Sequence, residues 1–219
     1  MRVGQLARLI DFFKKEGVDR AIMAGQITPG RLFDLRPDFK ALWLLARLKE
    51  RNAETLFGAV ADALEAEGIR LLPATTHLER FLARPGHVAG PKPHRRLQDE
   101  IDFGWSKLKQ IASMDIGQCL VLHKGTVLAV EGYDGTNATI RRGGGLAPGA
   151  TLLKVSKPGQ DMRFDVPVIG PDTIRVAAES GISAIVVEAE KTLLLGLDEI
   201  KELAQKEKMT IFAVSPEGA

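Results

Sequence analysis

The sequence predicts an α/β protein of two domains, and three observations support this fold class. Apolar residues recur at helical spacing in several segments, and short apolar runs alternate with those segments. The chain has 219 residues, of which 45% are hydrophobic, which is enough to build sizeable cores. Three prolines and two glycines without apolar periodicity interrupt the alternation between Ala83 and Arg96. We therefore expect an N-terminal domain at 1–83, a linker at 84–96 and a C-terminal domain at 97–219.

The N-terminal domain is predicted to be Rossmann-like. Helical spacing indicates a first helix that ends near Gly17, and "RAIMAG" then has the pattern of a short buried strand. Two helices are predicted in "DFKALWLLARLKER" and "ETLFGAVADALEAEG", and a strand in "IRLLP". A domain of this class usually opens with a strand, so the pattern indicates a truncated domain whose first strand is missing.

The C-terminal domain is predicted to be mixed α/β. We expect a long helix over 97–115, a hairpin that turns at Lys124 and Gly125, and a short helix or loop in "DGTNATIRRGGG". The strand "TLLKVSK", a helix over 171–181, the strand "SAIVVEAE", the helix "GLDEIKELAQKEK" and the strand "MTIFAVS" complete the pattern. The "RRGGG" run lacks the spacing of a phosphate-binding loop, and we expect a mobile surface loop there.

Composition and charge exclude several classes of protein. The balance of 30 basic and 28 acidic residues gives a net charge of +2, which argues against a nucleic-acid partner. One cysteine, Cys119, rules out a disulfide framework and fits a reducing compartment, so cytoplasmic location is the expectation. No apolar run is long enough to span a bilayer. The four scattered histidines have no zinc-ligand spacing, and we assign neither them nor Cys119 to catalysis.

The segment "KPGQDMRFDVPVIG" contains the first group of candidate site residues. Asp161, Arg163 and Asp165 alternate with apolar residues, a spacing that predicts a strand with all three charges on one face. Carboxylates suit magnesium and arginine suits phosphate, so this face, flanked by Lys154 and Lys157, fits a phosphoryl site. An exposed strand whose charges pair weakly in water explains the same spacing.

A second group lies in "AVEGYDGTN", where a predicted strand ends. Glu131, Asp134, Thr136 and Asn137 gather there, and open α/β sheets bind ligands at strand ends. The alternative is a simple turn at Asp134 and Gly135, with Thr136 or Asn137 capping the segment that follows.

Three stretches together carry a resemblance to a known family. They read "VLAVEGYDGTNATIRR", "LLKVSKPGQDMRFDVPVIGPDTI" and "AIVVEAEKTLLL", and they resemble the LpxI family of UDP-2,3-diacylglucosamine pyrophosphatases of Gram-negative lipid A synthesis. The similarity runs along nearly all of the chain, and "MAGQITPGRLFDLRPD" and "MDIGQCLVLHKGTVLAVE" also look like family segments.

The resemblance implies a cytoplasmic hydrolase that uses a divalent metal, expected to be magnesium, to cleave the phosphoric anhydride of UDP-2,3-diacylglucosamine. The products would be UMP and 2,3-diacylglucosamine 1-phosphate (lipid X), with water attacking the phosphorus on the sugar side. It also implies a homodimer and peripheral contact with the inner membrane. The catalytic residues would be Asp165, Asp161 and Arg163, with Asp165 and Asp161 at the metal. The substrate-binding residues would be Gln118, Glu131, Asp134, Thr136, Lys154, Lys157, Gln160 and Thr173.

Two departures from the family leave a second hypothesis open. The resemblance places a further strand and a glycine-rich turn, about fifty residues, before the position at which this sequence begins. Asn137 stands where the family usually has a carboxylate. A non-catalytic protein that binds a nucleotide sugar or lipid phosphate is therefore the alternative, and a purely structural protein is a third reading.

Overall fold

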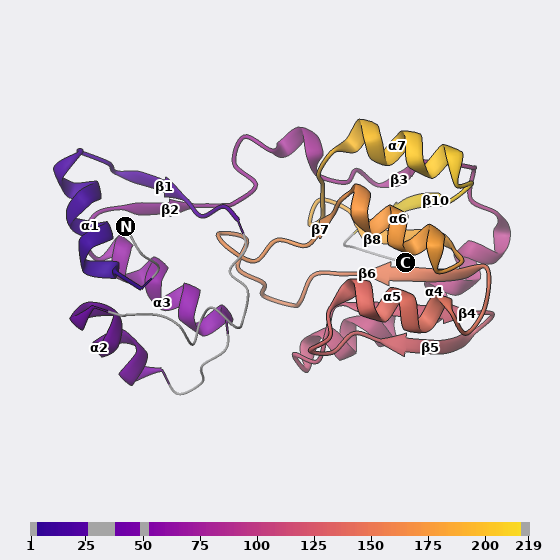
Figure 1. Cartoon of the computed structure of the whole chain (residues 1–219), viewed down its shortest axis with the longest axis horizontal. Helices are drawn as coiled ribbons and strands as arrows, with labels where there is room; N and C mark the ends of the chain where they lie inside the picture. The colour runs from indigo at the N-terminus through magenta and orange to yellow at the C-terminus, as the bar shows by residue number, and fades with distance from the viewer. Residues whose placement is uncertain (1–3, 26–37, 49–52, 216–219) are drawn as a thin grey trace. The chain divides into compact units, whose positions relative to one another are not determined.

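The computed structural model describes residues 4–25, 38–48 and 53–215, which fall into two compact units (Figure 1). The first unit comprises Met1–Thr76 and Asp161–Asp165, and the second comprises His77–Gln160 and Val166–Ala219. Each has its own hydrophobic core. The short segment Asp161–Asp165 therefore belongs by its contacts to the first unit, although residues of the second unit precede and follow it in the chain.

The first unit has the predicted order of elements. These are α1 (Leu6–Lys15), β1 (Arg20–Ile22), α2 (Phe39–Arg47), α3 (Ala53–Glu65) and β2 (Arg70–Leu72). The two strands pair in parallel, and the core includes Leu6, Ile10, Leu44, Leu64 and Ile69. The prediction that the first strand is buried is wrong, because Arg20 and Ile22 are exposed. Only β2 pairs with it among the described strands.

The second unit is built on a six-stranded mixed sheet. Its elements are η2 (Glu79–Phe81), β3 (Gly86–Ala89), α4 (Arg95–Ser113), β4 (Cys119–His123), β5 (Thr126–Val130), α5 (Thr136–Gly144), β6 (Ala150–Lys154), β7 (Val168–Ile169), α6 (Pro171–Glu179), β8 (Ile182–Glu188), β9 (Leu193–Leu194), α7 (Leu197–Lys206) and β10 (Thr210–Val214). The strand order is β3-β10-β8-β6-β4-β5. Strands β6, β8 and β10 are parallel, whereas β3, β4 and β5 complete the sheet through antiparallel pairs.

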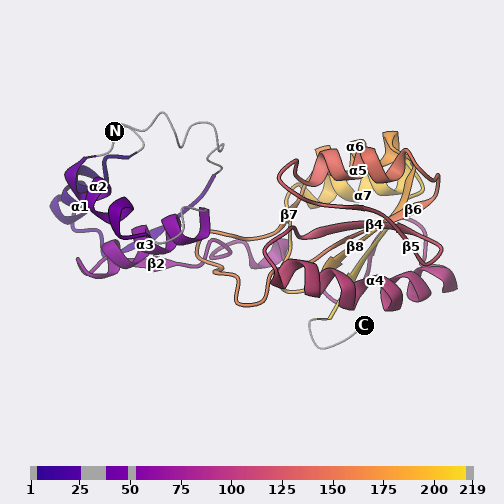
Figure 2. The same cartoon turned by 90° about the horizontal axis from the view of Figure 1, so that it is seen from below.

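Helices cover both faces of this sheet, as Figure 2 shows. Helix α4 packs on one face through Leu97, Ile101 and Leu108, which share a core with Leu120 and Val186. Helices α5, α6 and α7 pack on the opposite face, where they form the larger core. Since both faces are buried, charged side chains have room mainly at the ends of the strands.

Local sequence signals explain the turns and helix ends that were predicted. Lys124 and Gly125 both have positive φ, at 47° and 73°. A two-residue hairpin turn needs this conformation to match the right-handed twist of the strands that it joins. Pro171 is the first residue of α6. A backbone N–H at that position has no acceptor within the helix, so the lack of one in proline carries no penalty. Gly181 follows that helix with a φ of 78° and ends it.

The predicted linker at 84–96 is not a linker in the structure. Strand β3 lies within it and pairs with β10 at the edge of the sheet, and α4 already begins at Arg95. Strand β3 has only four residues, so its pattern does not stand out among the surrounding prolines and glycines. Four residues are nevertheless enough to cover the edge backbone of β10. Gly90 then lies so close to β10 that a Cβ atom there would be 1.9 Å from the carbonyl oxygen of Met209.

The expected mobile loop at "RRGGG" is also wrong, because these residues form the end of α5. A Cβ atom at Gly143 would lie 2.5 Å from Cβ of Val121, and one at Gly144 would lie 2.3 Å from the carbonyl oxygen of Ser180. The glycines therefore serve close packing of α5 on the sheet and on the end of α6.

The close approach at Gly143 predicts the effect of a single methyl group. We expect Gly143→Ala to lower the free energy of unfolding by about 1–3 kcal/mol, because the added carbon overlaps Val121. Thermal or urea unfolding measures the change. Gly132→Ala is the matched control, since its Cβ would meet no atom closer than 3.7 Å. Equal stability of the two variants would contradict the packing role.

The single thiol gives a second test of the core. Cys119 is fully buried in β4, and this burial raises the pKa of the thiol to about 12. We expect no alkylation by iodoacetamide in native protein near pH 8 and rapid alkylation in denaturing urea, because the thiolate is the reactive form. A Cys119→Ala/Ser113→Cys variant, with its thiol at an exposed position, should react without urea. Rapid labelling of the native wild-type chain would contradict the burial.

Candidate active site

One edge of the six-stranded sheet gathers polar residues from several strands. The register pairs Cys119 of β4 with Lys154 of β6, and Lys154 with Val187 of β8. Because β4 is antiparallel to β6, the start of β4 and the carboxyl ends of β5, β6, β8 and β10 lie at this edge. In open α/β sheets, ligands bind outside the carboxyl ends of the strands. This end of the sheet, which we name the site edge, is therefore the candidate site of the second unit.

Thr136 is the centre of a hydrogen-bonded group at this edge. Its hydroxyl Oγ1 donates to Glu131 Oε1 at 2.8 Å and accepts from Lys154 Nζ at 3.0 Å. The other oxygen of Glu131, Oε2, accepts from the backbone N–H of Gln118 at 2.9 Å. The structure therefore brings together four of the predicted substrate-binding residues, with Gln118 taking part through its backbone. The carboxylate of Glu131, the hydroxyl of Thr136 and the ammonium group of Lys154 are thus joined by consecutive hydrogen bonds, and all three residues are half-buried.

Two glycines shape this group. A Cβ atom at Gly117 would lie 2.2 Å from the carbonyl oxygen of Glu131, so only glycine lets the start of β4 approach the end of β5 this closely. Gly135 precedes α5 with a φ of 79°, a conformation that favours glycine. The sharp turn that it permits places Thr136 as the first residue of the helix.

Asp134 has a different role from its neighbours. Its Oδ1 accepts from the backbone N–H of Gly132 at 3.1 Å, and its Oδ2 accepts from Arg142 at 3.0 Å. The bond from Arg142 holds the pKa of the Asp134 carboxyl below its usual value. These contacts match the turn interpretation of Asp134, and they leave the residue outside the Thr136 group.

The residues after β6 begin a second part of the site. The backbone N–H of Lys157 donates to Gln160 Oε1 at 2.7 Å, and the Lys157 ammonium forms an ion pair with Asp115. The amide nitrogen Nε2 of Gln160 is buried and has no hydrogen-bond partner among the described residues. Thr173 lies in the first turn of α6, and no hydrogen bond recorded in the described chain joins its hydroxyl to Thr136 or Lys154.

The segment Asp161–Asp165 is a turn and not the predicted strand. The carbonyl oxygen of Asp161 accepts from the backbone N–H of Phe164 at 3.3 Å and of Asp165 at 3.0 Å. Its side-chain Oδ1 accepts from the backbone N–H of Arg163 at 3.0 Å, the local bond by which aspartate favours turns over strands. The prediction of one charged face is therefore wrong, and all residues from Asp161 to Val166 are half-buried.

Contacts within the first unit hold this turn. Arg163 donates from Nε and Nη2 to the Asp161 carboxylate at 2.7–3.0 Å, and from Nη1 to Glu65 of α3 at 2.9 Å. The ring of Phe164 packs against Phe57, with 5.8 Å between ring centroids. The backbone N–H of Ala74 also donates to the carbonyl of Met162 at 2.8 Å. The turn is thus fixed by a salt bridge, an aromatic contact and a backbone bond.

These contacts bear on which carboxylate is open to a metal. The Arg163 guanidinium contacts both oxygens of Asp161 and holds the pKa of that carboxyl below its usual value, so a metal at Asp161 would have to share these oxygens with Arg163. Among the described residues, no three His, Cys, Asp or Glu side chains cluster as a metal site. The Asp165 carboxylate forms no recorded hydrogen bond or ion pair within the described chain. Magnesium often takes only one or two carboxylates besides phosphate oxygens, and Asp165 fits that smaller role.

Sequence reasoning missed one polar cluster at the same edge. Glu188 is the last residue of β8, and its buried carboxylate is bound by Lys109 and Ser156. The available signal was the carboxylate itself, which follows the apolar run "SAIVV" in a strand predicted to be buried. Buried charges are almost always paired, so a partner for Glu188 was to be expected.

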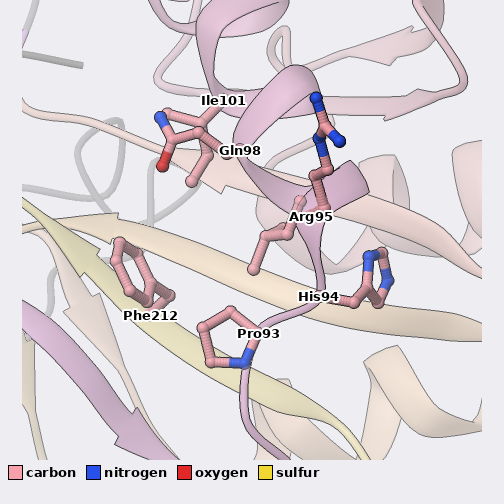
Figure 3. A pocket seen from close by; sticks show the side chains of 7 residues that line it. Pro93, His94, Arg95, Gln98, Ile101 and Phe212 are labelled. Atoms are coloured by element: carbon pink, nitrogen blue, oxygen red, sulfur yellow. The ribbon is translucent and has the colours of Figure 1, made fainter.

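A cavity of about 220 Å³ lies elsewhere in the second unit, beside the start of α4. Figure 3 shows Pro93, Ile101 and Phe212 around it, with the guanidinium of Arg95 turned away from these apolar side chains. Along the same helix, Lys109 lies about 12 Å beyond Ile101, the last α4 residue that lines the cavity, at 1.5 Å per residue. None of the residues that line the cavity belongs to the Thr136 group or contacts Glu188 in the described hydrogen bonds.

Comparisons with known proteins agree with both units. A sequence model of the LpxI N-terminal domain matches residues 1–81, and one of the LpxI C-terminal domain matches residues 84–212. The chain is also similar to the UDP-2,3-diacylglucosamine pyrophosphatase LpxI of Caulobacter vibrioides. The two are 28% identical over 227 residues, which cover 98% of this chain and 81% of the relative. Because the two domain matches span nearly the whole sequence, the resemblance is confirmed and the chain belongs to the LpxI family.

Proposed function

We propose that this protein hydrolyses the pyrophosphate of UDP-2,3-diacylglucosamine, giving UMP and 2,3-diacylglucosamine 1-phosphate in lipid A synthesis. The observation that carries the proposal is the similarity, over 98% of the chain, to a relative with that activity in its name. The geometry supports it, because an ammonium group and a carboxylate are held at the edge where α/β sheets bind ligands.

Lys154 is the residue best placed to meet a phosphate in the second unit. Its ammonium group has three donors, and one of them is directed at Thr136. A pyrophosphate repels an incoming nucleophile through its own negative charge, and a fixed ammonium group lowers that repulsion. The bond from Thr136 to Glu131 fixes the hydroxyl that holds Lys154, so Glu131 acts through Thr136.

Asp165 is the proposed catalytic carboxylate. Within the described chain it forms no recorded hydrogen bond or ion pair, whereas Asp161 is occupied by Arg163. Asp165 would orient the attacking water and would hold a divalent cation, expected to be magnesium. When bound, that cation would supply positive charge to the phosphoryl oxygens. The water oxygen would form a bond to the phosphorus on the sugar side as the bond to the bridging oxygen breaks, and UMP would leave with that oxygen.

Asp161 and Arg163 receive a different role in this proposal. Arg163 donates hydrogen bonds to two carboxylates, those of Asp161 and Glu65, so its guanidinium is already engaged and is not available to bind a substrate phosphate. The pair instead fixes the turn from which Asp165 projects. We therefore propose that Asp161 and Arg163 position Asp165 and do not themselves bind the metal.

A non-catalytic binding protein is the second candidate, and Asn137 favours it. This residue is exposed in the first turn of α5, directly after Thr136, and a neutral amide cannot replace a carboxylate that activates water. Such a protein would still bind UDP-2,3-diacylglucosamine and gain thermal stability from it, because ligand binding favours the native state. Turnover separates the two candidates.

We further propose cytoplasmic location with peripheral contact to the inner membrane. Phe39, Leu42 and Trp43 lie on one stripe of α2 and are 91%, 48% and 58% exposed. The guanidinium of Arg47 lies 3.7 Å from the centre of a Trp43 ring. Exposed aromatic and aliphatic side chains with a cation are typical of helices at a lipid surface. Within the described residues, no helix has the length and apolar character of a membrane span.

The hydroxyl of Thr136 can be tested by two substitutions. We expect Thr136→Val to lower kcat/KM for UMP release by about ten-fold or more, because Oε1 of Glu131 loses its donor and Lys154 loses its acceptor. Thr136→Ser keeps the hydroxyl and should stay within about three-fold of wild type. Equal rates for the valine and serine variants would show that the hydroxyl is not used.

The carboxylate of Asp165 is the second target. We expect Asp165→Asn to lower kcat by about a hundred-fold or more, since the amide removes the negative charge that serves the water and the cation. The matched control is Asp198→Asn, an exposed aspartate in the first turn of α7. Magnesium-dependent UMP release measures both variants. A full rate in folded Asp165→Asn protein would refute the assignment, and a folded wild-type chain that binds substrate without turnover would favour the binding protein.

A further inference from the structure

Glu188 and Ser156, both buried, and the partly exposed Lys109 form a hydrogen-bonded cluster at the site edge, which we name the Ser156 clamp. Oε2 of Glu188 accepts from the backbone N–H of Ser156 at 2.7 Å, from its Oγ at 2.7 Å and from Lys109 Nζ at 2.7 Å. Oε1 of Glu188 accepts from Lys109 Nζ at 2.8 Å, and the same ammonium donates to the carbonyl of Ser156 at 3.2 Å. Every polar group of Ser156 is therefore bound by the Glu188–Lys109 pair.

Stability alone does not explain this pair. The Glu188 side chain is only 4% exposed, and taking a carboxylate out of water is unfavourable even when a cation accompanies it. Replacing a buried ion pair by apolar side chains of similar volume is often neutral or stabilising. Lys109 is the partner that remains partly exposed, so the unfavourable desolvation falls mainly on Glu188. The retained charges point to a role in fixing geometry.

The geometry that the clamp fixes is the exit of the chain from β6. Lys154 ends that strand and reaches Thr136, and Lys157 pairs with Asp115 three residues later. The backbone N–H of Val155 donates to the carbonyl of Gln118 at 3.0 Å, which ties the same stretch to the start of β4. Ser156 is the link between the strand and the segment that carries Gln160, and Glu188 holds it from the neighbouring strand.

We propose that Glu188 and Lys109 are positioning residues for the pyrophosphatase reaction. They hold Ser156, and through it they keep Lys154 and the residues after it in the arrangement that the reaction needs. The inference rests on the proposed function, and it adds two residues that contact neither substrate nor metal. Glu188 supplies the acceptor that Ser156 requires, while Lys109 binds both oxygens of that acceptor and so fixes its orientation.

The experiment compares two buried carboxylates of the second unit. Glu188→Ala removes the clamp. In assays run well below the melting temperature of the variant, we expect kcat to fall about ten-fold or more while KM changes about three-fold or less. Glu100 is the matched control: it is also buried, and it accepts from the backbone N–H of Lys124 and from the hydroxyl of Thr151 at the opposite end of the strands. Glu100→Ala should lower the melting temperature and leave kcat of the folded protein unchanged.

A rescue variant separates positioning from a merely structural role. In Lys109→Met/Glu188→Gln, an amide oxygen remains to accept from Ser156 and no ammonium is left unpaired. We expect this variant to restore kcat to within about three-fold of wild type, since the acceptor is what positions Ser156. A loss as large as in Glu188→Ala, or equal kcat for the Glu188→Ala and Glu100→Ala variants, would overturn the proposal.

Hydrogen exchange gives a readout that does not need turnover. The Ser156 amide donates to a buried carboxylate and should exchange slowly in wild type and much faster in Glu188→Ala, while exchange of the β6 amides stays unchanged. Unchanged exchange in that variant would overturn the clamp alone. If folded wild type showed slow exchange at Ser156 but no UMP release from UDP-2,3-diacylglucosamine, the proposed function would fall, and the positioning role would fall with it.

Discussion

The parallel pairing of β6 with β8 is the interaction on which the candidate site depends. It sets Lys154 beside Val187, so Glu188, the last residue of β8, lies within reach of Ser156, two residues past the end of β6. Both faces of the sheet are covered by helices, and the strands are apolar along most of their length. Charged side chains are therefore confined to strand ends, and the register decides which of them become neighbours.

Periodicity predicted most elements of the fold because burial and local turn chemistry agree in them. The hairpin at Lys124 and Gly125, the start of α6 at Pro171 and its end at Gly181 each follow from one residue's backbone preferences. The four-residue strand β3 was missed because its signal is too short to stand out among prolines. What identifies it is the exposed backbone of β10, which lies more than a hundred residues away in the sequence.

The candidate site shows the same division between local and distant causes. Glu131, Thr136 and Lys154 were predicted from strand ends and family motifs, and the structure joins them. The alternation of Asp161, Arg163 and Asp165 predicted a strand, yet the Asp161 side chain bonds to the backbone of Arg163 and makes a turn. Alternation cannot reveal that bond, because both conformations place the same residues in the same order. Glu188 and Lys109 are 79 residues apart, and no motif connects them.

The membership of Asp161–Asp165 in the first unit has a consequence for how this protein can be divided. The chain passes from one unit to the other between Thr76 and His77, and it returns briefly for five residues before leaving again. A break at that first junction would give two polypeptides, yet the shorter one would still hold Asp161–Asp165 of the longer one through Glu65, Phe57 and Ala74. The fragments would thus carry their own means of recognising each other. A gene split at this point would encode halves suited to reassembly. Residues 77–219 made alone would carry the Asp161–Asp165 turn without its contacts to Glu65, Phe57 and Ala74.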